Sequence, residues 1–116
     1  MAEWARITVA DVARELTAQV TGGEALDAEV TGAQVCDLLS HVMARGREGQ
    51  VWITIQTHPN IVAVAALARL SAIVLAHGMQ PEEETVMRAE DEAIPLLLSE
   101  EAAYTLAGRL YQLGVR

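Results

Sequence analysis

The chain has 116 residues, of which 52% are hydrophobic and 3% aromatic, and its eight arginines and 16 acidic residues give a formal net charge of −8. The length fits a single domain over residues 1–116, and the apolar fraction excludes a disordered chain. The negative charge argues against binding to nucleic acid or to an anionic membrane surface, because both depend on clustered basic residues.

Cys36 is the only cysteine, so the chain cannot form an internal disulfide. This indicates a reduced, cytoplasmic setting. The first residues lack the apolar stretch of a signal peptide, and no run reaches the roughly 18 apolar residues of a membrane span. We therefore expect a cytoplasmic protein with no membrane segment.

In chain order, the first predicted element is a helix that begins after Thr8, whose side chain forms a capping box with Asp11. An extended piece over 18–20 ends at the turn Thr21-Gly22-Gly23. A strand over 29–35 and a short helix, ended by Gly46, complete the first half.

The second half begins with a strand over 51–56 that is rich in β-branched residues. The turn His58-Pro59-Asn60 leads into a helix over 61–70 that is apolar nearly all round, which predicts burial on more than one side. A fully apolar strand over 72–76 is typical of the middle of a covered sheet. Pro81 begins the next helix, with glutamates in its first turn.

The last predicted strand covers 94–98, and Pro95 indicates an edge or entry position. Ser99 is expected to cap a final helix that Gly114 ends. Strands and helices thus alternate at short spacing. This predicts an α/β fold, a single three-layer domain with a mainly parallel sheet flanked by helices.

In open parallel sheets, ligands bind beyond the carboxyl ends of the strands. The polar residues expected there are the candidate ligand-binding residues: Asp37, Thr54, Gln56, Thr57, His58, Asn60, His77 and Gly78. The alternative is structural, with Thr57 or His58 capping a helix and Asn60 bonding a turn.

We expect neither a metal nor a cofactor. Cys36, Asp37, His58 and His77 could be combined into a metal site, but they lack the paired short spacing of zinc ligands. A chain without lysine cannot form a P-loop, and no G-x-S-x-G motif surrounds Ser40 or Ser99. We therefore expect no enzymatic activity, and a buried, unreactive thiol is the simplest interpretation of Cys36.

Three further features have alternative interpretations. Trp4 and Trp52 could be ligand platforms, but Trp52 alternates with apolar neighbours, which favours packing. Tyr104 and Tyr111 share one face of the last helix, where Gly108 would let it pack closely on another element or on a second subunit. The eight acids of 82–101 form either a solvated face or a docking site for a basic partner.

Segment 51–65, VWITIQTHPNIVAVA, resembles the small stand-alone DRTGG-domain proteins. So do the opening helix, Thr21-Gly22-Gly23, Val30-Thr31-Gly32 and the segments 80–83 and 94–96. The resemblance covers nearly the whole chain and extends to the N-terminal, non-catalytic domain of HPr kinase/phosphorylase. Two runs match part of the motif that names the family: 29–33, which keeps Thr and Gly without Arg, and alternatively 21–23.

The resemblance implies a regulatory or assembly module, often at a dimer interface, that brings no catalytic residues. Such domains occur beside CBS domains in regulated pyrophosphatases, and stand-alone versions are associated with iron-only hydrogenase systems of anaerobic bacteria. We therefore expect a non-catalytic homodimer that binds a small ligand such as a nucleotide. The alternative is a pure interaction module that docks a protein partner without a small ligand.

Overall fold

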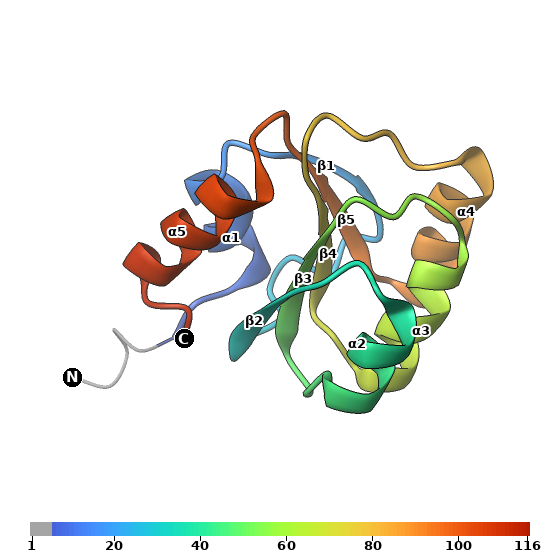
Figure 1. Cartoon of the computed structure of the whole chain (residues 1–116), viewed down its shortest axis with the longest axis horizontal. Coiled ribbons are helices and arrows are strands. Elements are labelled where there is room, and N and C mark those ends of the chain that lie inside the picture. The colour runs from blue at the N-terminus through green and yellow to red at the C-terminus, as the bar shows by residue number, and fades with distance from the viewer. Residues whose placement is uncertain (1–5) are drawn as a thin grey trace.

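Five strands form one sheet in the order β1-β5-β4-β3-β2 in the computed structural model, which describes residues 6–116 (Figure 1). The strands are β1 (Gln19–Gly22), β2 (Gly32–Val35), β3 (Gln50–Thr54), β4 (Ala72–Leu75) and β5 (Pro95–Leu98). Strands β2 to β5 run parallel, and β1 lies antiparallel beside β5. The predicted mainly parallel sheet is confirmed.

Five helices cover the two faces of the sheet: α1 (Val9–Glu15), α2 (Leu39–Arg45), α3 (Asn60–Ala68), α4 (Glu83–Glu92) and α5 (Ala103–Leu113). Each crossover from β2 to β5 moves one strand in the same direction, and right-handed crossovers of this kind place their helices on one face. Helices α2, α3 and α4 accordingly share one face, while α1 and α5 lie together on the other (Figure 1). This is the predicted three-layer arrangement.

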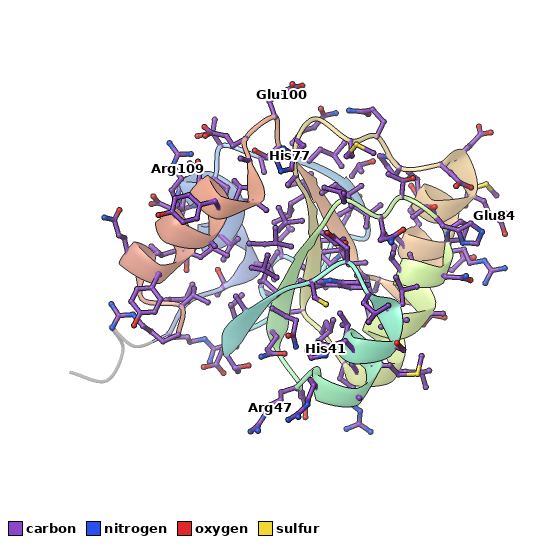
Figure 2. All side chains as sticks on the ribbon, viewed as in Figure 1. His41, Arg47, His77, Glu84, Glu100 and Arg109 are labelled. Atoms are coloured by element: carbon purple, nitrogen blue, oxygen red, sulfur yellow. The ribbon has the colours of Figure 1, made fainter. Side chains whose placement is uncertain are left out.

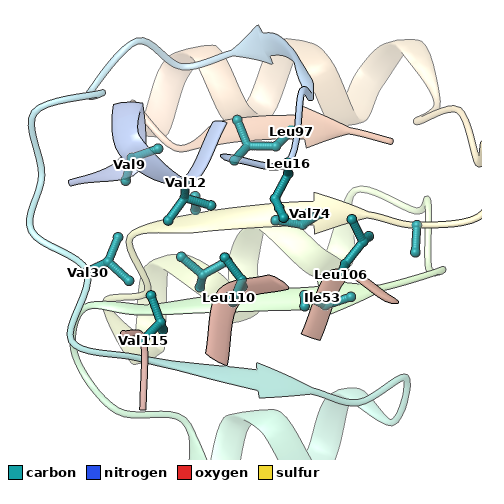
Figure 3. Close-up of a cluster of buried hydrophobic side chains, with 13 residues drawn as sticks. Val9, Val12, Leu16, Val30, Ile53, Val74, Leu97, Leu106, Leu110 and Val115 are labelled. Atoms are coloured by element: carbon teal, nitrogen blue, oxygen red, sulfur yellow. The ribbon is translucent and has the colours of Figure 1, made fainter. Parts of the chain in front are cut away.

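Each face has its own hydrophobic core, because successive side chains of a strand point to opposite sides. Val51 and Ile53 of β3 pack under α1 and α5 with Leu106 and Leu110 (Figure 3). The intervening Trp52 packs with α2 and α3 in the second core. The apolar helix α3 lies between α2 and α4 and buries Ile61, Val62, Val64 and Ala65, as the sequence predicts.

Several predicted boundaries differ from the observed ones. The strand predicted over 29–35 is a strand only from Gly32, because Glu29 instead forms an isolated bridge with Thr8. Strand β3 ends at Thr54, two residues earlier than predicted. Pro95 begins β5, which has a neighbour on both sides, so the proline marks an entry position rather than an edge.

The prediction that Ser99 caps the last helix is wrong. Helix α5 begins after Ala102, and the Ser99 hydroxyl instead accepts a hydrogen bond from the Glu101 N–H at 3.1 Å. Trp4, named above as a candidate ligand platform, lies outside the described residues. Within residues 6–116, every helix is too short or too polar to cross a bilayer.

The predicted capping box at the start of α1 is confirmed. The Asp11 N–H donates to Thr8 Oγ1 at 3.3 Å, and the Thr8 N–H donates to Asp11 Oδ2 at 2.9 Å. The hydrogen bonds from the backbone and hydroxyl of Thr8, aided by the Arg14 guanidinium, hold the pKa of Asp11 below its ordinary value. The ionised carboxylate therefore stabilises the folded chain.

Asp11→Ala is expected to lower the free energy of unfolding by about 1 kcal/mol at neutral pH, as loss of a cap does. A lowered carboxyl pKa contributes stability that is fully present above the unfolded-state pKa and is lost as pH falls through the folded-state pKa. The difference between variant and wild type should therefore shrink between about pH 5 and about pH 2 in urea unfolding experiments. A difference that stayed constant over that range would contradict this account, and Asp27→Ala serves as the exposed control.

Candidate functional site

The polar residues at the ends of β2 and β3 lie close together, as predicted. They hydrogen-bond to one another, however, and so are not free for a ligand. The Asp37 carboxylate accepts hydrogen bonds from Thr54 Oγ1 at 2.7 Å and from the Ile55 N–H at 3.0 Å. The Gln56 side-chain amide donates to the Asp37 carbonyl at 2.9 Å, and the Gln56 N–H donates to Thr54 Oγ1 at 3.2 Å. These three predicted site residues therefore fasten the loop after β2 to the loop after β3.

A further bond joins β3 itself to the residue that follows β2, through Trp52. Its indole Nε1 donates to the Cys36 carbonyl at 2.7 Å from a fully buried ring. Among the described residues, no buried side-chain nitrogen or oxygen lacks a hydrogen-bond partner. This end of the sheet is thus held together by bonds within the chain.

Thr57, His58 and Asn60 lie at the start of α3 and serve its connections. The Thr57 carbonyl accepts from Thr85 Oγ1 at 2.7 Å and from the Glu82 N–H at 3.2 Å, which ties this loop to the start of α4. His58 Nδ1 accepts from the Asn60 N–H at 3.0 Å. This bond is the helix-capping alternative that the sequence offered for His58.

His77 and Gly78 follow β4 and lie against a different loop, the one that follows β5. The His77 N–H donates to the Glu101 carbonyl and the Gly78 N–H donates to the Ser99 carbonyl, both at 2.8 Å. His77 Nε2 accepts from the Ala103 N–H at 3.3 Å and so provides the cap of α5 that was predicted from Ser99. Figure 2 shows His77 beside the loop of Glu100, so the single predicted pocket is divided between two loops.

The connections after β4 and β5 leave the sheet toward opposite faces. Strand β4 leads to α4, which lies with α2 and α3, whereas β5 leads to α5, which lies with α1 (Figure 1). Adjacent parallel strands with diverging connections open a crevice at their carboxyl ends, and open α/β sheets bind ligands there. A hollow of about 220 Å³ lies at this place, lined by Thr17, Gln19, Gly78, Gln80, Leu98, Ser99 and Glu100.

The lining of this hollow consists of neutral hydrogen-bonding groups and one carboxylate, that of Glu100. Gly78 has a φ of +71°, and a Cβ there would lie 3.0 Å from Glu100 Oε1. Glycine therefore suits both the left-handed backbone and the close approach of the carboxylate. The hollow offers oxygen atoms that accept hydrogen bonds from hydroxyl groups. Its side-chain amides can pair with the polar edge of a ring, and none of its lining residues is basic.

Of the predicted site residues, only Gly78 lines this hollow, and His77 lies next to it in the chain. Sequence reasoning missed Thr17, Gln19, Gln80 and Glu100 as site residues. Ser99 was visible as a polar residue at a strand end. No local signal marks Thr17 and Gln19, because they reach the hollow only through the pairing of β1 with β5.

The four residues considered for a metal do not gather. His58 and His77 each use a ring nitrogen to accept a backbone N–H at the start of a different helix. Within residues 6–116, no group of three or more histidine, cysteine or acidic side chains has a spacing that would hold a metal ion.

Comparison with known proteins gives a family and a structural likeness. The family model described as DRTGG domain matches residues 11–113. The fold is similar to that of the CBS and DRTGG domains of the regulatory region of Clostridium perfringens pyrophosphatase, solved in complex with its activator, diadenosine tetraphosphate. The TM-score is 0.76 at 16% identity, and the match covers 97% of this chain and 49% of the pyrophosphatase chain. This chain therefore spans about half the length of the pyrophosphatase chain. No curated protein matches.

Proposed function

Since the chain belongs to the DRTGG domain family, we propose that it is a non-catalytic regulatory module that binds a nucleoside or nucleotide in the hollow beside the ends of β4 and β5. The observation that carries the proposal is the position of this hollow, where the connections after the two strands diverge. The presence of a nucleotide activator in the complex of the similar pyrophosphatase region supports this class of ligand.

The chemistry of the lining favours the sugar and base of a nucleotide over its phosphates. A carboxylate such as that of Glu100 accepts hydrogen bonds from ribose hydroxyls, as an acidic residue does in dinucleotide-binding folds. The side-chain amides of Gln19 and Gln80 can donate to and accept from a base edge. Phosphates would be repelled by Glu100 and by the net charge of −8, so we place them toward the solvent.

The small size of the hollow favours a single nucleoside over a larger ligand. At about 220 Å³ it is smaller than the roughly 300–1,000 Å³ of a typical ligand site. A larger ligand with two nucleosides would therefore place one of them here and the other outside.

The first test is thermal unfolding of the full chain with adenosine, AMP, ATP and diadenosine tetraphosphate. A ligand that binds only the folded state adds about 2.7 kcal/mol when present at 100 times its dissociation constant. For a domain of this size, that raises the melting temperature by about 10 °C. Adenosine should stabilise the chain at least as well as ATP at equal concentration, because the phosphates add repulsion.

Two pairs of exposed substitutions distinguish the hollow from the site predicted at residues 56–60. Gln19→Ala with Gln80→Ala should abolish the ligand-induced shift and leave the ligand-free melting temperature within about 2 °C of wild type. His58→Ala with Asn60→Ala should leave the ligand-induced shift intact. The opposite pattern would place the ligand at the predicted site instead. No shift with any ligand would favour the alternative, an interaction module without a small ligand.

The proposal also includes association of the chain with a second copy of itself. Twofold symmetric dimers are the commonest oligomers, and many exposed apolar side chains of this domain lie on helices. Sedimentation of the ligand-free chain tests this part of the proposal separately from nucleotide binding.

A further inference from the structure

Four polar side chains that line the hollow beside the ends of β4 and β5 make no bonds within the described chain. They belong to Thr17, Gln19, Gln80 and Glu100, which are all exposed. Residues 6–116 hold no hydrogen-bond or ion-pair partner for any of these four side chains. The side chains of Asp37 and Thr54 at the other strand ends, by contrast, bond to each other at 2.7 Å. The polar groups of the hollow are therefore available to a ligand.

Thr17 lines this hollow with a backbone conformation that suits glycine better. It follows Leu16, the last residue of the α1 cap, and its φ is +51°. Glycine is the usual residue at this position after a helix, and a β-branched residue in the left-handed region is unfavourable. No bond of the Thr17 hydroxyl within the described chain offsets this strain. Strained residues of this kind cluster at ligand sites, so the strain at Thr17 points to a role for its side chain in the hollow.

Glu100 and Glu101 are neighbours in the chain, but their carboxylates have different surroundings. The Glu101 carboxylate lies 3.7 Å from the Arg109 guanidinium, in an ion pair. The Glu100 carboxylate instead lies against Gly78, where a Cβ would be 3.0 Å from Oε1. An ionised carboxylate has two oxygens that only accept hydrogen bonds, so it can bind two neighbouring hydroxyl groups at once. Glu100 is thus the group of the hollow best suited to a pair of hydroxyls.

We propose that the hollow selects its ligand by the 2′,3′-diol of a ribose, with the Glu100 carboxylate accepting hydrogen bonds from both hydroxyls and the Thr17 hydroxyl contacting the same sugar. The inference rests on the proposed function and narrows the ligand class of that site to ribonucleosides. The side-chain amides of Gln19 and Gln80 then remain for the base.

The rest of the lining agrees with a sugar rather than with a phosphate or a cation. Leu98 adds an apolar side chain, and the Ser99 hydroxyl accepts from the Glu101 N–H and keeps its own hydrogen to donate. A sugar has hydroxyl groups at its edge and C–H groups on its faces, so a lining of this mixed kind suits it. A phosphate would meet no basic side chain in this lining, and one carboxylate is too few to hold a divalent cation.

The first test is isothermal titration calorimetry of the full chain with adenosine, 2′-deoxyadenosine, 3′-deoxyadenosine and free ribose. Each deoxynucleoside lacks one hydrogen bond to the Glu100 carboxylate, so it is expected to bind about tenfold or more weakly than adenosine. Free ribose should bind more weakly than adenosine, because it has no base for the two glutamines. Ribose that bound as tightly as adenosine would make the ligand a sugar and overturn the ribonucleoside class.

Two substitutions test the residues themselves. Thr17→Gly is expected to have opposite effects on stability and binding: relief of the left-handed strain raises the ligand-free melting temperature by about 3 °C, while loss of the hydroxyl weakens adenosine binding about fivefold. Glu100→Gln should bring the affinities for adenosine and 2′-deoxyadenosine within about twofold of each other, because the paired acceptor is lost. Ala93→Gly is the matched control: Ala93 also has a left-handed backbone, with a φ of +59°, but lies before β5, so its variant should bind adenosine like the wild type.

The outcomes separate this inference from the proposed function. A chain that binds no nucleoside or nucleotide overturns the proposed function and this inference with it. Equal binding of adenosine and 2′-deoxyadenosine by the wild type overturns the selection for the diol and leaves a nucleoside site in place. A Thr17→Gly variant that melts at a lower temperature, or that binds adenosine as tightly as the wild type, overturns the role of Thr17 in the site.

Discussion

Replacing Trp52 by alanine is expected to lower the free energy of unfolding by about 3–5 kcal/mol, out of the roughly 5–15 kcal/mol typical of a domain. The Trp52 side chain is fully buried and is the largest in the core beneath α2 and α3. The substitution removes its packing and also the hydrogen bond from its Nε1 to the Cys36 carbonyl. It therefore weakens both a core and the connection between β3 and the residue that follows β2.

Urea unfolding followed by circular dichroism measures this effect. Trp52→Phe should have a smaller effect of about 1–3 kcal/mol, because a ring remains but the Cys36 carbonyl loses its donor. Leu67→Ala, at an exposed position, should stay within about 0.5 kcal/mol of wild type. A loss below about 1 kcal/mol for Trp52→Ala would contradict the close packing of this core.

Gly23→Ala is expected to destabilise the fold by about 3 kcal/mol, although it adds only one methyl group. A Cβ at Gly23 would lie 2.3 Å from the Ile94 nitrogen and 2.4 Å from the Ala93 carbonyl carbon. These are backbone atoms at the entry to β5, so they cannot move aside as a flexible side chain would. The preceding Gly22 has a φ of +76°, which also favours glycine.

Gly32→Ala is the matched control, since the nearest atom to a Cβ there is Gln50 Cγ at 3.6 Å, an ordinary contact. We expect its free energy of unfolding to stay within about 0.5 kcal/mol of wild type. The sequence offered two partial matches to the motif that names the family, one around Gly32 and one at Thr21-Gly22-Gly23. The steric need for glycine favours residues 21–23, and equal losses in the two variants would contradict that assignment.

Local signals in the sequence predicted the elements well. The capping box at Thr8 and Asp11 lies within four residues, and it is present as predicted. Strands β3 and β4 are covered by helices on both faces of the sheet, and α3 lies between α2 and α4. All three are buried and apolar, so their composition alone identified them. The alternation of strands and helices along the chain was enough to predict a layered fold with parallel strands.

Contacts between distant segments could not be predicted in this way. The cap of α5 comes from His77, whose ring accepts the Ala103 N–H from 26 residues earlier in the chain. The sequence predicted this cap from Ser99, which is nearer in the chain. The hollow depends on β1 lying antiparallel beside β5, and the sequence of β1 does not specify that neighbour. The predicted polar residues do lie at the carboxyl ends of the strands. Their polar groups, however, hydrogen-bond to one another, as Thr54 does to Asp37.

Helices α1 and α5 come from opposite ends of the described chain, yet they share one face of the sheet, and Gly114 lies close enough to Ile7 for a Cβ there to meet its Cδ1 at 3.5 Å. The polypeptide therefore enters and leaves this fold at nearly the same point. Domains with adjacent ends can be inserted into a surface loop of a host protein while leaving the path of the host chain almost unchanged. Such a geometry allows the same module to be combined with unrelated domains through short connections.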